Sequence, residues 1–362
     1  MEKQGRKLKK KFKIILVLVA ILLIGIATLL GTYCYFKSPV SNDKKEVSIV
    51  IENGSTISDI AALLKKEGLI KNENFFKLYV KLKKVSNVYA AKYYFSPSMN
   101  LDEIINTLNE GGYNENEISI TFKEGINMRG IAKLIKENTS NREDDVYKKL
   151  KDEKYLNSAI EKYWFLTDDI KNSKIYYSLE GYLFPDTYRF NSKDVTVEEI
   201  FNKMLDQMEK ELNKYKKQIE NSKYSIHELM TLASITQSEG YNEDDFKNIA
   251  SVFYNRLKTG MALGSCVTSY YGVKKDMTDE LLQKDIDASN PYNTRGNNPV
   301  SFPVGPISMP GAKALDATLD PIETSYYFFV SDKNSKLYFT KTLNEHERMI
   351  TKLQNEGLWL EW

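Results

Sequence analysis

A long apolar run near the start of the sequence constrains the fold of this chain more than any other feature. Residues 14–36 contain no charged side chain. As a helix rising 1.5 Å per residue, a segment of this length spans roughly 30 Å, which matches the hydrocarbon core of a bilayer. We therefore predict one transmembrane helix over residues 14–36, with residues 1–13 on one side of the membrane and the remainder of the chain on the other.

The sequence on either side of this run favours a permanent anchor over a cleaved signal peptide. Residues 1–13 hold seven Lys or Arg and one Glu, and such a basic flank stays in the cytoplasm. The apolar core of a signal peptide covers about 7–15 residues and is followed by small residues, whereas this run is longer and ends in bulky aromatic residues. The bulky Tyr33 also disfavours a lipid-anchored Cys34. We expect a single-pass protein of the cell membrane, N-terminus cytoplasmic, with everything after Lys37 extracytoplasmic.

Charge and residue usage exclude several classes of function. The seven basic and one acidic residue of the tail give it a charge of +6, and since the whole chain carries +2, the remaining residues carry −4. That part has no basic surplus to neutralise phosphates, so we expect no nucleic-acid partner. Cys34 and Cys266 are too few for a disulfide framework. With two His and no CxxC or HExxH motif, we expect no metal and no cofactor.

A polar linker at residues 37–46 leads into a region with three similar strand–turn–helix patterns. Each has a short strand, a turn with Gly or Pro, and a helix with one apolar face. The three copies start at residues 47, 89 and 118. One interpretation is an α+β domain built from common motifs. The other is a wall-polysaccharide-binding module over residues 47–137 that resembles the LysM fold and is partly duplicated.

Residues 179–190 combine aromatic, acidic and turn-forming side chains in a pattern too irregular for a helix and too polar for a buried strand. The polar and aromatic candidates in it are Glu180, Tyr182, Asp186 and Tyr188. Two interpretations stay open. The stretch is either an ordinary packed loop or the wall of a sugar cleft, where aromatic faces stack on pyranose rings and charged tips bind hydroxyls.

A predicted helix over residues 225–240 places one carboxyl against apolar neighbours. A capping-box sequence begins at Ser225, and Gly240 is a favoured residue just past a helix end. On this helix Leu232, Ile235 and Glu239 share one face. Burial beside apolar groups and the negative end of the helix dipole both raise the pKa of such a carboxyl. Glu239 therefore has the properties of a general acid for glycosidic cleavage; the alternative is a helix-terminal surface glutamate.

The chain then forms a second predicted helix at 242–260 and a long irregular stretch at 261–311. Asn255 and Arg256 lie near the end of that helix, available to a cleft or simply exposed. Gly, Pro and Asn punctuate the irregular stretch, and an ordered loop of this length inside a compact domain is usually functional. A hairpin is expected at 325–340. The candidates in the irregular stretch are Thr268, Tyr271, Tyr292, Asn293 and Thr294.

Seven motifs, in order and at matching spacing, resemble the MltG-like endolytic murein transglycosylases, the YceG-like family. They lie at residues 179–188, 233–239, 250–257, 292–294, 305–307, 310–311 and 345–346. The predicted anchor and the LysM-like region match as well. The resemblance implies an α+β fold in which the transmembrane helix and linker are followed by a LysM-like α+β subdomain at 47–137 and a YceG-like catalytic domain at 138–362.

The resemblance also implies a reaction. The family cleaves the MurNAc-β-1,4-GlcNAc bond within nascent peptidoglycan strands, leaves 1,6-anhydroMurNAc ends, and so terminates or shortens glycan strands. One carboxyl suffices, because the C6 hydroxyl of the sugar is the nucleophile. The family's catalytic glutamate corresponds to Glu239. Some relatives also carry Glu at the position of Gln237, which here cannot donate and recover a proton. The substrate-binding residues implied are Glu180, Tyr182, Asp186, Tyr188, Asn255, Arg256, Thr268, Tyr271, Tyr292, Asn293 and Thr294.

Three positions depart from the family pattern. Cys266 and the next residue stand where many relatives have Asp-Pro, Arg295 replaces a Tyr, and Leu337 replaces a His. The partners that the resemblance implies are peptidoglycan strands, the membrane and synthases of the elongation machinery.

Two other functions compete with the transglycosylase. The first is a non-catalytic, peptidoglycan-binding scaffold of the wall-synthesis machinery. The second is a hydrolase that uses two carboxylates, Glu239 together with Glu180 or Asp186.

Overall fold

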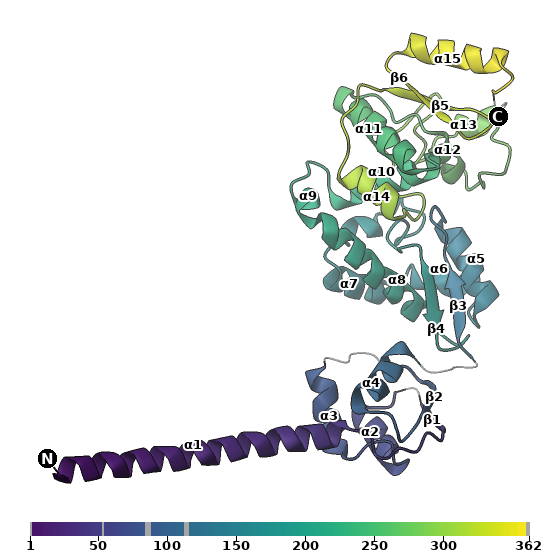
Figure 1. Ribbon diagram of the computed structural model, residues 1–362. Helices are drawn as coiled ribbons and strands as arrows, with labels where there is room; N and C mark the ends of the chain where they lie inside the picture. The colour runs from purple at the N-terminus through teal and green to yellow at the C-terminus, as the bar shows by residue number, and fades with distance from the viewer. Residues whose placement is uncertain (1, 53, 84–87, 112–115, 360–362) are drawn as a thin grey trace. The chain divides into compact units, whose positions relative to one another are not determined.

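The computed structural model describes residues 2–52, 54–83, 88–111 and 116–359, with side chains from Leu18 onward except Ala20 and Glu110. It has a mixed α+β fold and divides into two compact units, Met1–Glu117 and Ile118–Trp362. Each unit has its own apolar core. Figure 1 shows the elements of both units, coloured by residue number.

The first unit packs three short helices against a two-stranded antiparallel sheet. Strands β1 and β2 pair so that Ile49 lies opposite Tyr93. Alternate residues of both strands point into the core, as expected of a half-buried sheet. Residues that accept hydrogen bonds from the first turn cap the helices: Thr56 for α2 and Asn100 for α4. The elements are α1 (Glu2–Lys37), β1 (Val47–Ile51), α2 (Ile57–Lys66), α3 (Glu73–Leu82), β2 (Ala91–Phe95) and α4 (Leu101–Glu110).

The predicted transmembrane segment lies within α1, whose C-terminal end packs on the rest of the first unit. Tyr33 and Phe36 contact Phe75 of α3 with ring centroids 5.9 and 5.3 Å apart, and Lys37 pairs with Asp102 at 2.7 Å. Over the residues whose side chains are described, no helix is both long and apolar enough to cross a bilayer. This finding does not support the predicted transmembrane span. The side chains of residues 14–17 and 20 of that span, and those of the basic tail, lie outside the described part of the chain.

The second unit contains two further antiparallel pairs and most of the helices. Strand β3 pairs with β4, and β5 pairs with β6. Short 3-10 turns at Asp168–Lys171 and Asn213–Tyr215 complete it. Its elements are β3 (Ile118–Thr121), α5 (Met128–Asn138), α6 (Glu143–Lys149), α7 (Glu153–Lys162), β4 (Thr187–Phe190), α8 (Val197–Leu212), α9 (Lys216–Glu220), α10 (Ile226–Glu239), α11 (Glu243–Thr259), α12 (Cys266–Gly272), α13 (Gln283–Ile286), α14 (Ala312–Leu319), β5 (Phe328–Ser331), β6 (Leu337–Thr340) and α15 (Leu343–Asn355).

The division between the units differs from the predicted boundary at residue 137. The third strand–turn–helix pattern, β3 and α5, belongs to the second unit because β3 pairs with β4, where Ile120 lies opposite Tyr188. A strand joins the unit that supplies its hydrogen-bonding partner. The local pattern of β3 did not reveal that its partner lies 66 residues farther along the chain, at Thr187 opposite Thr121.

Helix α10 lies at the centre of the second unit. Nine of its fourteen residues are buried, including every residue from Leu229 to Thr236. Helices α11 and α14 pack against it (Figure 1). A helix buried on nearly all sides has little freedom to shift. Its last residue, Glu239, is therefore held at a fixed place in the unit.

Candidate functional site

The predicted helix that carries Glu239 is confirmed, with a different role for the glycine that follows it. Ser225 caps α10 with a capping box, and Glu239 is the last helical residue. Gly240 has an extended backbone at φ −101° instead of the left-handed conformation typical of helix ends. A Cβ at this position would lie 2.4 Å from Cδ1 of Phe246. Glycine is thus required by the close approach of α11, whose Asn242 cap begins immediately afterward.

The Glu239 carboxyl is half-buried and bound by a serine. The hydroxyl of Ser265 donates a hydrogen bond to Glu239 Oε1, and Ser265 is only 2% exposed. Burial raises the pKa of the Glu239 carboxyl above its ordinary value, while the Ser265 hydrogen bond, the charges of Arg295 and Arg256, and the Val267 amide act in the opposite direction. The raised pKa was predicted from burial and from the helix dipole. The structure confirms the direction and supplies burial as the cause.

Two arginines bring positive charge to this carboxyl. The Arg256 guanidinium donates to the carbonyls of Tyr327 and Leu263 and lies over the Phe328 ring, 5.3 Å from its centroid. Arg295 is exposed and donates to the sulfur of Cys266. Both cations favour the carboxylate form of Glu239. Of the two, Arg256 is held by protein contacts and Arg295 is open to solvent.

Burial raises the pKa of the Cys266 thiol, which keeps it protonated and a poor nucleophile. A protonated cysteine of this kind behaves as a small apolar side chain.

Four of the predicted substrate-binding residues form the wall behind Ser265. Thr268 and Thr294 share a hydrogen bond of 2.9 Å, and Asn293 Oδ1 accepts from Ser269 at 2.7 Å. Tyr292 packs against Tyr271 with ring centroids 4.7 Å apart. Thr268, Tyr292, Asn293 and Thr294 are each at most 2% exposed. The structure gives them a supporting role, and their direct contact with substrate stays a prediction.

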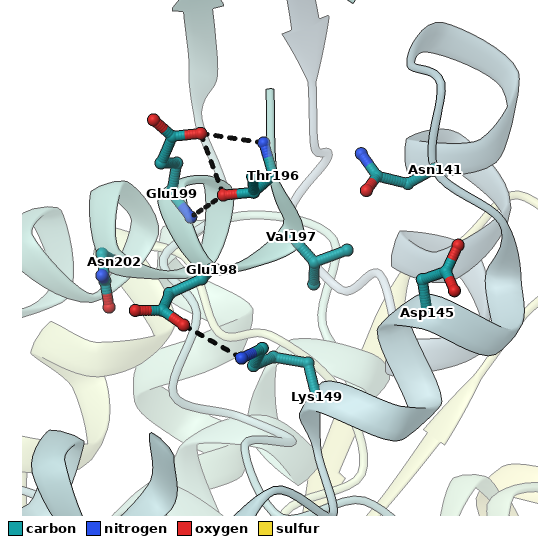
Figure 2. Close-up of a pocket in the computed structure, with 8 residues that line it drawn as sticks. All are labelled: Asn141, Asp145, Lys149, Thr196, Val197, Glu198, Glu199 and Asn202. Carbon is teal, nitrogen blue, oxygen red and sulfur yellow. Dashed lines mark hydrogen bonds and ion pairs between the residues drawn. The ribbon is translucent and has the colours of Figure 1, made fainter. Parts of the chain in front are cut away.

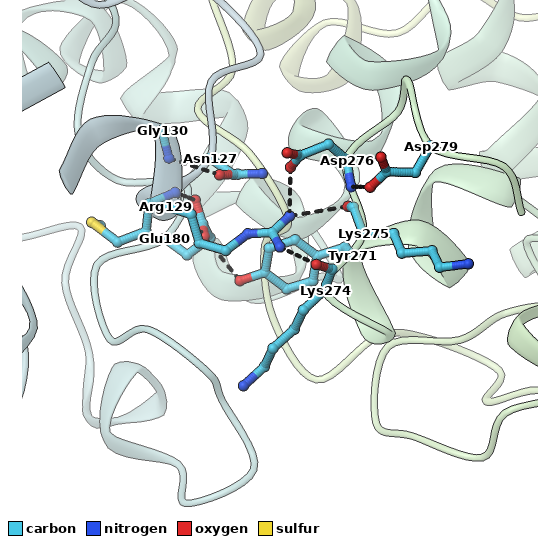
Figure 3. Close-up of polar contacts among 10 residues, drawn as sticks. Asn127, Arg129, Gly130, Glu180, Tyr271, Lys274, Lys275, Asp276 and Asp279 are labelled. Atoms are coloured by element: carbon cyan, nitrogen blue, oxygen red, sulfur yellow. Dashed lines mark hydrogen bonds and ion pairs between the residues drawn. The ribbon is translucent and has the colours of Figure 1, made fainter. Parts of the chain in front are cut away.

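Glu180 is buried and serves as a structural hydrogen-bond acceptor. Its oxygens lie 3.0 and 3.1 Å from the amide of Met128, the first residue of α5, and Tyr271 donates to it at 2.9 Å (Figure 3). Burial raises the pKa of the Glu180 carboxyl to about 8. Beside it, Arg129 donates to the carbonyls of Lys274 and Lys275, so that α5 holds the loop after α12. Glu180 thus joins the start of α5, through Met128, to α12, through Tyr271.

The remaining candidates in the 179–190 stretch pack as an ordinary loop. The Tyr182 hydroxyl bonds Nδ1 of His227 at 2.8 Å, and the Tyr188 hydroxyl donates to the Phe184 carbonyl at 2.8 Å. Both tyrosines are buried in the largest core. Asp186 is exposed at the start of β4, where its carboxylate accepts from the Thr187 amide. The packed-loop interpretation therefore describes the tyrosines.

Asn255 and Gln237 bind backbone on either side of the site. The Asn255 amide donates to the carbonyls of Thr324 and Tyr326, both at 2.9 Å, and so fastens the segment before β5 to α11. Gln237 accepts from the Gly311 amide at 2.8 Å. The Gln237 side chain is thereby bound to the Gly311 backbone, whereas Glu239 on the same helix contacts Ser265.

A separate hollow of about 600 Å³ lies between α6 and the start of α8 (Figure 2). Its charged side chains already have partners. Lys149 pairs with Glu198 at 2.9 Å, and Glu199 accepts from the Thr196 cap of α8. Asp145 pairs with Arg142 at 3.1 Å. None of the residues that line this hollow belongs to the Glu239 site.

Sequence reasoning missed Ser265 as a functional residue. It lies between a glycine and Cys266 in the irregular stretch, with no periodicity to indicate that it faces Glu239. Arg295 was noted only as a departure from the family pattern. A contact between segments 26 residues apart, such as Ser265 with Glu239, leaves no local signal in one sequence.

Comparisons with known proteins agree on one family. The model of the YceG-like family matches residues 49–352. An endolytic murein transglycosylase from Bacillus subtilis (strain 168) is 39% identical over 329 residues, which cover 89% of this chain and 90% of that protein. An endolytic murein transglycosylase from Streptococcus pneumoniae serotype 2 (strain D39) is 30% identical over 334 residues, covering 88% and 60% respectively. The 2.6 Å crystal structure of a putative YceG-like protein from Listeria monocytogenes matches with a TM-score of 0.59 at 34% identity, covering 84% of this chain and 99% of that one.

Proposed function

Because the chain belongs to the YceG-like family, we propose that it is a peptidoglycan lytic transglycosylase that cuts within glycan strands. The bond broken is MurNAc-β-1,4-GlcNAc, and the products carry 1,6-anhydroMurNAc ends. The observation that carries the proposal is the Glu239 carboxyl, which is half-buried at the end of a fixed helix and bound by one serine hydroxyl. The names of the curated relatives support the substrate and the reaction.

The environment of Glu239 suits the two proton transfers of this reaction. Burial favours the protonated acid, which donates its proton to the glycosidic oxygen as the bond breaks. The carboxylate that remains is stabilised by Arg256, Arg295 and Ser265. It then takes the proton of the sugar C6 hydroxyl while that oxygen bonds to C1. The proton is returned to Glu239 and no water is consumed.

The two-carboxylate hydrolase is less well supported. Such enzymes need a second carboxyl about 5–9 Å from the first, accessible to the sugar or to a water. The Glu180 carboxyl is 1% exposed and committed to Met128 and Tyr271. Asp186 directly precedes β4, whose neighbour in the sheet is β3. Neither carboxyl has a contact with Ser265 or Glu239 in the described part of the chain.

The decisive experiment measures products. The full chain is incubated with glycan strands, and mass spectrometry distinguishes anhydro ends from reducing ends, which are heavier by one water. We expect anhydro-ended fragments from the wild type. Glu239→Gln should release them at least about 100-fold more slowly, since a general acid typically contributes 10²–10⁴-fold. The matched control is Glu323→Gln, an exposed carboxyl, which should match the wild type.

The alternatives predict other products. Strand binding without any cleavage by the wild type would support the scaffold instead. Reducing ends would support the hydrolase. Equal rates for the wild type and Glu239→Gln would remove Glu239 from the mechanism.

We also propose that residues 14–36 anchor the protein in the cell membrane, with the catalytic unit outside. The uncharged run and the basic tail support this proposal. The test is fractionation. The full chain should stay with membranes after alkaline extraction, and protease added outside spheroplasts should reach residues after Lys37 only. Release into the soluble fraction by alkali would contradict the anchor. A synthase partner of the elongation machinery is a further proposal, which cross-linking in intact cells followed by mass spectrometry would test.

A further inference from the structure

Ser265, whose hydroxyl contacts Glu239, has its backbone amide and carbonyl both held by hydrogen bonds. Ser265 directly precedes α12 and is 2% exposed. Its amide donates to Thr294 Oγ1 at 3.0 Å, and its carbonyl accepts from Thr268 Oγ1 at 2.7 Å. The two threonines bond each other at 2.9 Å, and the Thr294 amide donates to Thr268 Oγ1 at 3.1 Å. The backbone of Ser265 is therefore held from both sides.

Counting protons assigns the direction of each bond. Each hydroxyl has one proton to donate. Thr268 Oγ1 donates to the Ser265 carbonyl at 2.7 Å, and Thr294 Oγ1 approaches the same carbonyl at 3.4 Å. With the shorter bond made by Thr268, Thr294 is the donor between the two threonines. Thr294 Oγ1 still has a lone pair for the Ser265 amide. The Ser265 hydroxyl takes no part in these bonds and donates its proton to Glu239 Oε1. The cluster of Ser265, Thr268 and Thr294, here called the hydroxyl cluster, thus presents one donor to the acid.

We propose that Ser265 is a positioning residue that holds Oε1 of Glu239 and so selects Oε2 as the oxygen that gives and recovers the catalytic proton. The inference rests on the proposed function and deepens it. In the first step the proton passes from Oε2 to the glycosidic oxygen. In the second step Oε2 takes the proton of the C6 hydroxyl. The Ser265 hydrogen bond to Oε1 is kept throughout, so the carboxyl does not rotate between the two steps.

A positioning role for Ser265 predicts a change in the pKa of Glu239 on removal of the Ser265 hydroxyl, whereas a purely structural role predicts none. A hydrogen bond donated to a carboxylate stabilises the charged form, and here it opposes the effect of burial. Removing the donor raises the pKa of Glu239. The reaction needs the protonated acid at the start, so the alkaline limb of the pH profile of kcat/KM should move to higher pH.

The experiment compares three variants of the full chain with the wild type, using the anhydro-product assay across pH. Ser265→Ala should lower kcat/KM at least about tenfold at its optimum, because the acid loses its fixed orientation. It should also move the alkaline limb upward by on the order of one pH unit. Ser265→Thr keeps the hydroxyl and should restore most of both. The control is Ser251→Ala, a buried serine on α11 that bonds Thr324, which should leave the alkaline limb in place.

Each result decides between the proposals. If Ser265→Ala leaves the alkaline limb where the wild type has it, Ser265 does not position the acid. If Ser265→Ala fails to fold, Ser265→Cys, which keeps the volume but donates weakly, carries the same comparison. If the wild type makes no anhydro ends, or Glu239→Gln makes as many, the proposed function fails first. If Glu239→Gln loses the anhydro products as expected but Ser265→Ala leaves the alkaline limb of kcat/KM unshifted, the proposed function stands and only the role of Ser265 is overturned.

Discussion

Glu180 offers a quantitative test of the buried site, because its carboxyl is fully enclosed beside a helix end. The carboxyl is 1% exposed, and burial raises its pKa from 4.5 to about 8. Below pH 4.5 the group is neutral in both the folded and unfolded chain, so its contribution to stability is fully present. As the pH rises from 4.5 to about 8, the unfolded state releases a proton that the folded state retains. The free energy of unfolding therefore falls across this window.

The size of the effect follows from the pKa difference. At 1.4 kcal/mol per pH unit, a pKa raised from 4.5 to about 8 corresponds to a loss of roughly 5 kcal/mol between pH 4.5 and pH 8. Glu180→Gln removes the ionisation while it keeps a carbonyl oxygen that can accept from Met128 and Tyr271. The variant should therefore be less sensitive to pH than the wild type. The measured quantity is the difference between the two proteins, which cancels the titration of other groups.

The assay is urea unfolding at pH 5 and pH 9, followed by tryptophan fluorescence. The sequence has no tryptophan before Trp164, and Trp164 and Trp359 belong to the described part of the second unit, so the signal reports the unit that contains Glu180. Glu180→Gln should gain stability relative to the wild type at pH 9 compared with pH 5. The control is Glu137→Gln, which changes an exposed carboxyl on α5 and should follow the wild type. If wild type and Glu180→Gln lose stability in parallel, Glu180 is not held neutral in the fold.

Two further predictions concern the neighbourhood of Glu239. Gly240→Ala should lower Tm and slow strand cleavage, because its Cβ would lie 2.4 Å from Phe246 and overpacking typically costs about 1–3 kcal/mol. Adding Phe246→Leu should restore both Tm and the cleavage rate. If Gly240→Ala alone loses neither, the close approach of Phe246 is contradicted. Arg295→Gln should move the alkaline limb of kcat/KM to higher pH, since Arg295 lowers the pKa of Glu239. Arg295→Lys keeps the charge and should not move it; equal shifts in both variants would show that charge is not the cause.

The parts of the fold that the sequence predicted are those with local causes. The capping box at Ser225 starts α10 where the sequence pattern places it. Helix α11 begins after Asn242 and ends at Gly260, whose φ of 72° suits glycine. The hairpin of β5 and β6 was expected from two short apolar runs and a turn. In each case neighbouring residues suffice to determine the element.

The parts that were missed depend on contacts between distant segments. The pairing of β3 with β4 and the burial of Tyr182 against His227 require a tertiary neighbour that periodicity does not reveal. Helix α14 has eight residues and forms where α10 and α11 cover it. Short helices of this kind are stabilised by packing more than by propensity. Ser265 was missed for the same reason. Its contact with Glu239 forms only when the end of α10 packs beside the start of α12, and neither segment alone indicates that contact.

Two of the three departures from the family pattern, Cys266 and Arg295, are in contact with each other in the structure. Arg295 donates to the sulfur of Cys266, and both lie close enough to Glu239 to affect its charge balance. The resemblance implies Asp and Tyr at these two positions, a negative and a neutral side chain. This chain carries a neutral and a positive side chain there, so against that pattern its proposed site would be more positive by two charges. That change favours the Glu239 carboxylate and lowers the pKa of the acid. The third departure, Leu337, is partly buried against the apolar cluster of Ile235 and leaves this charge balance untouched. We therefore propose that Cys266 and Arg295 adjust the pH range over which Glu239 would act as an acid, and that they leave the identity of that acid unchanged.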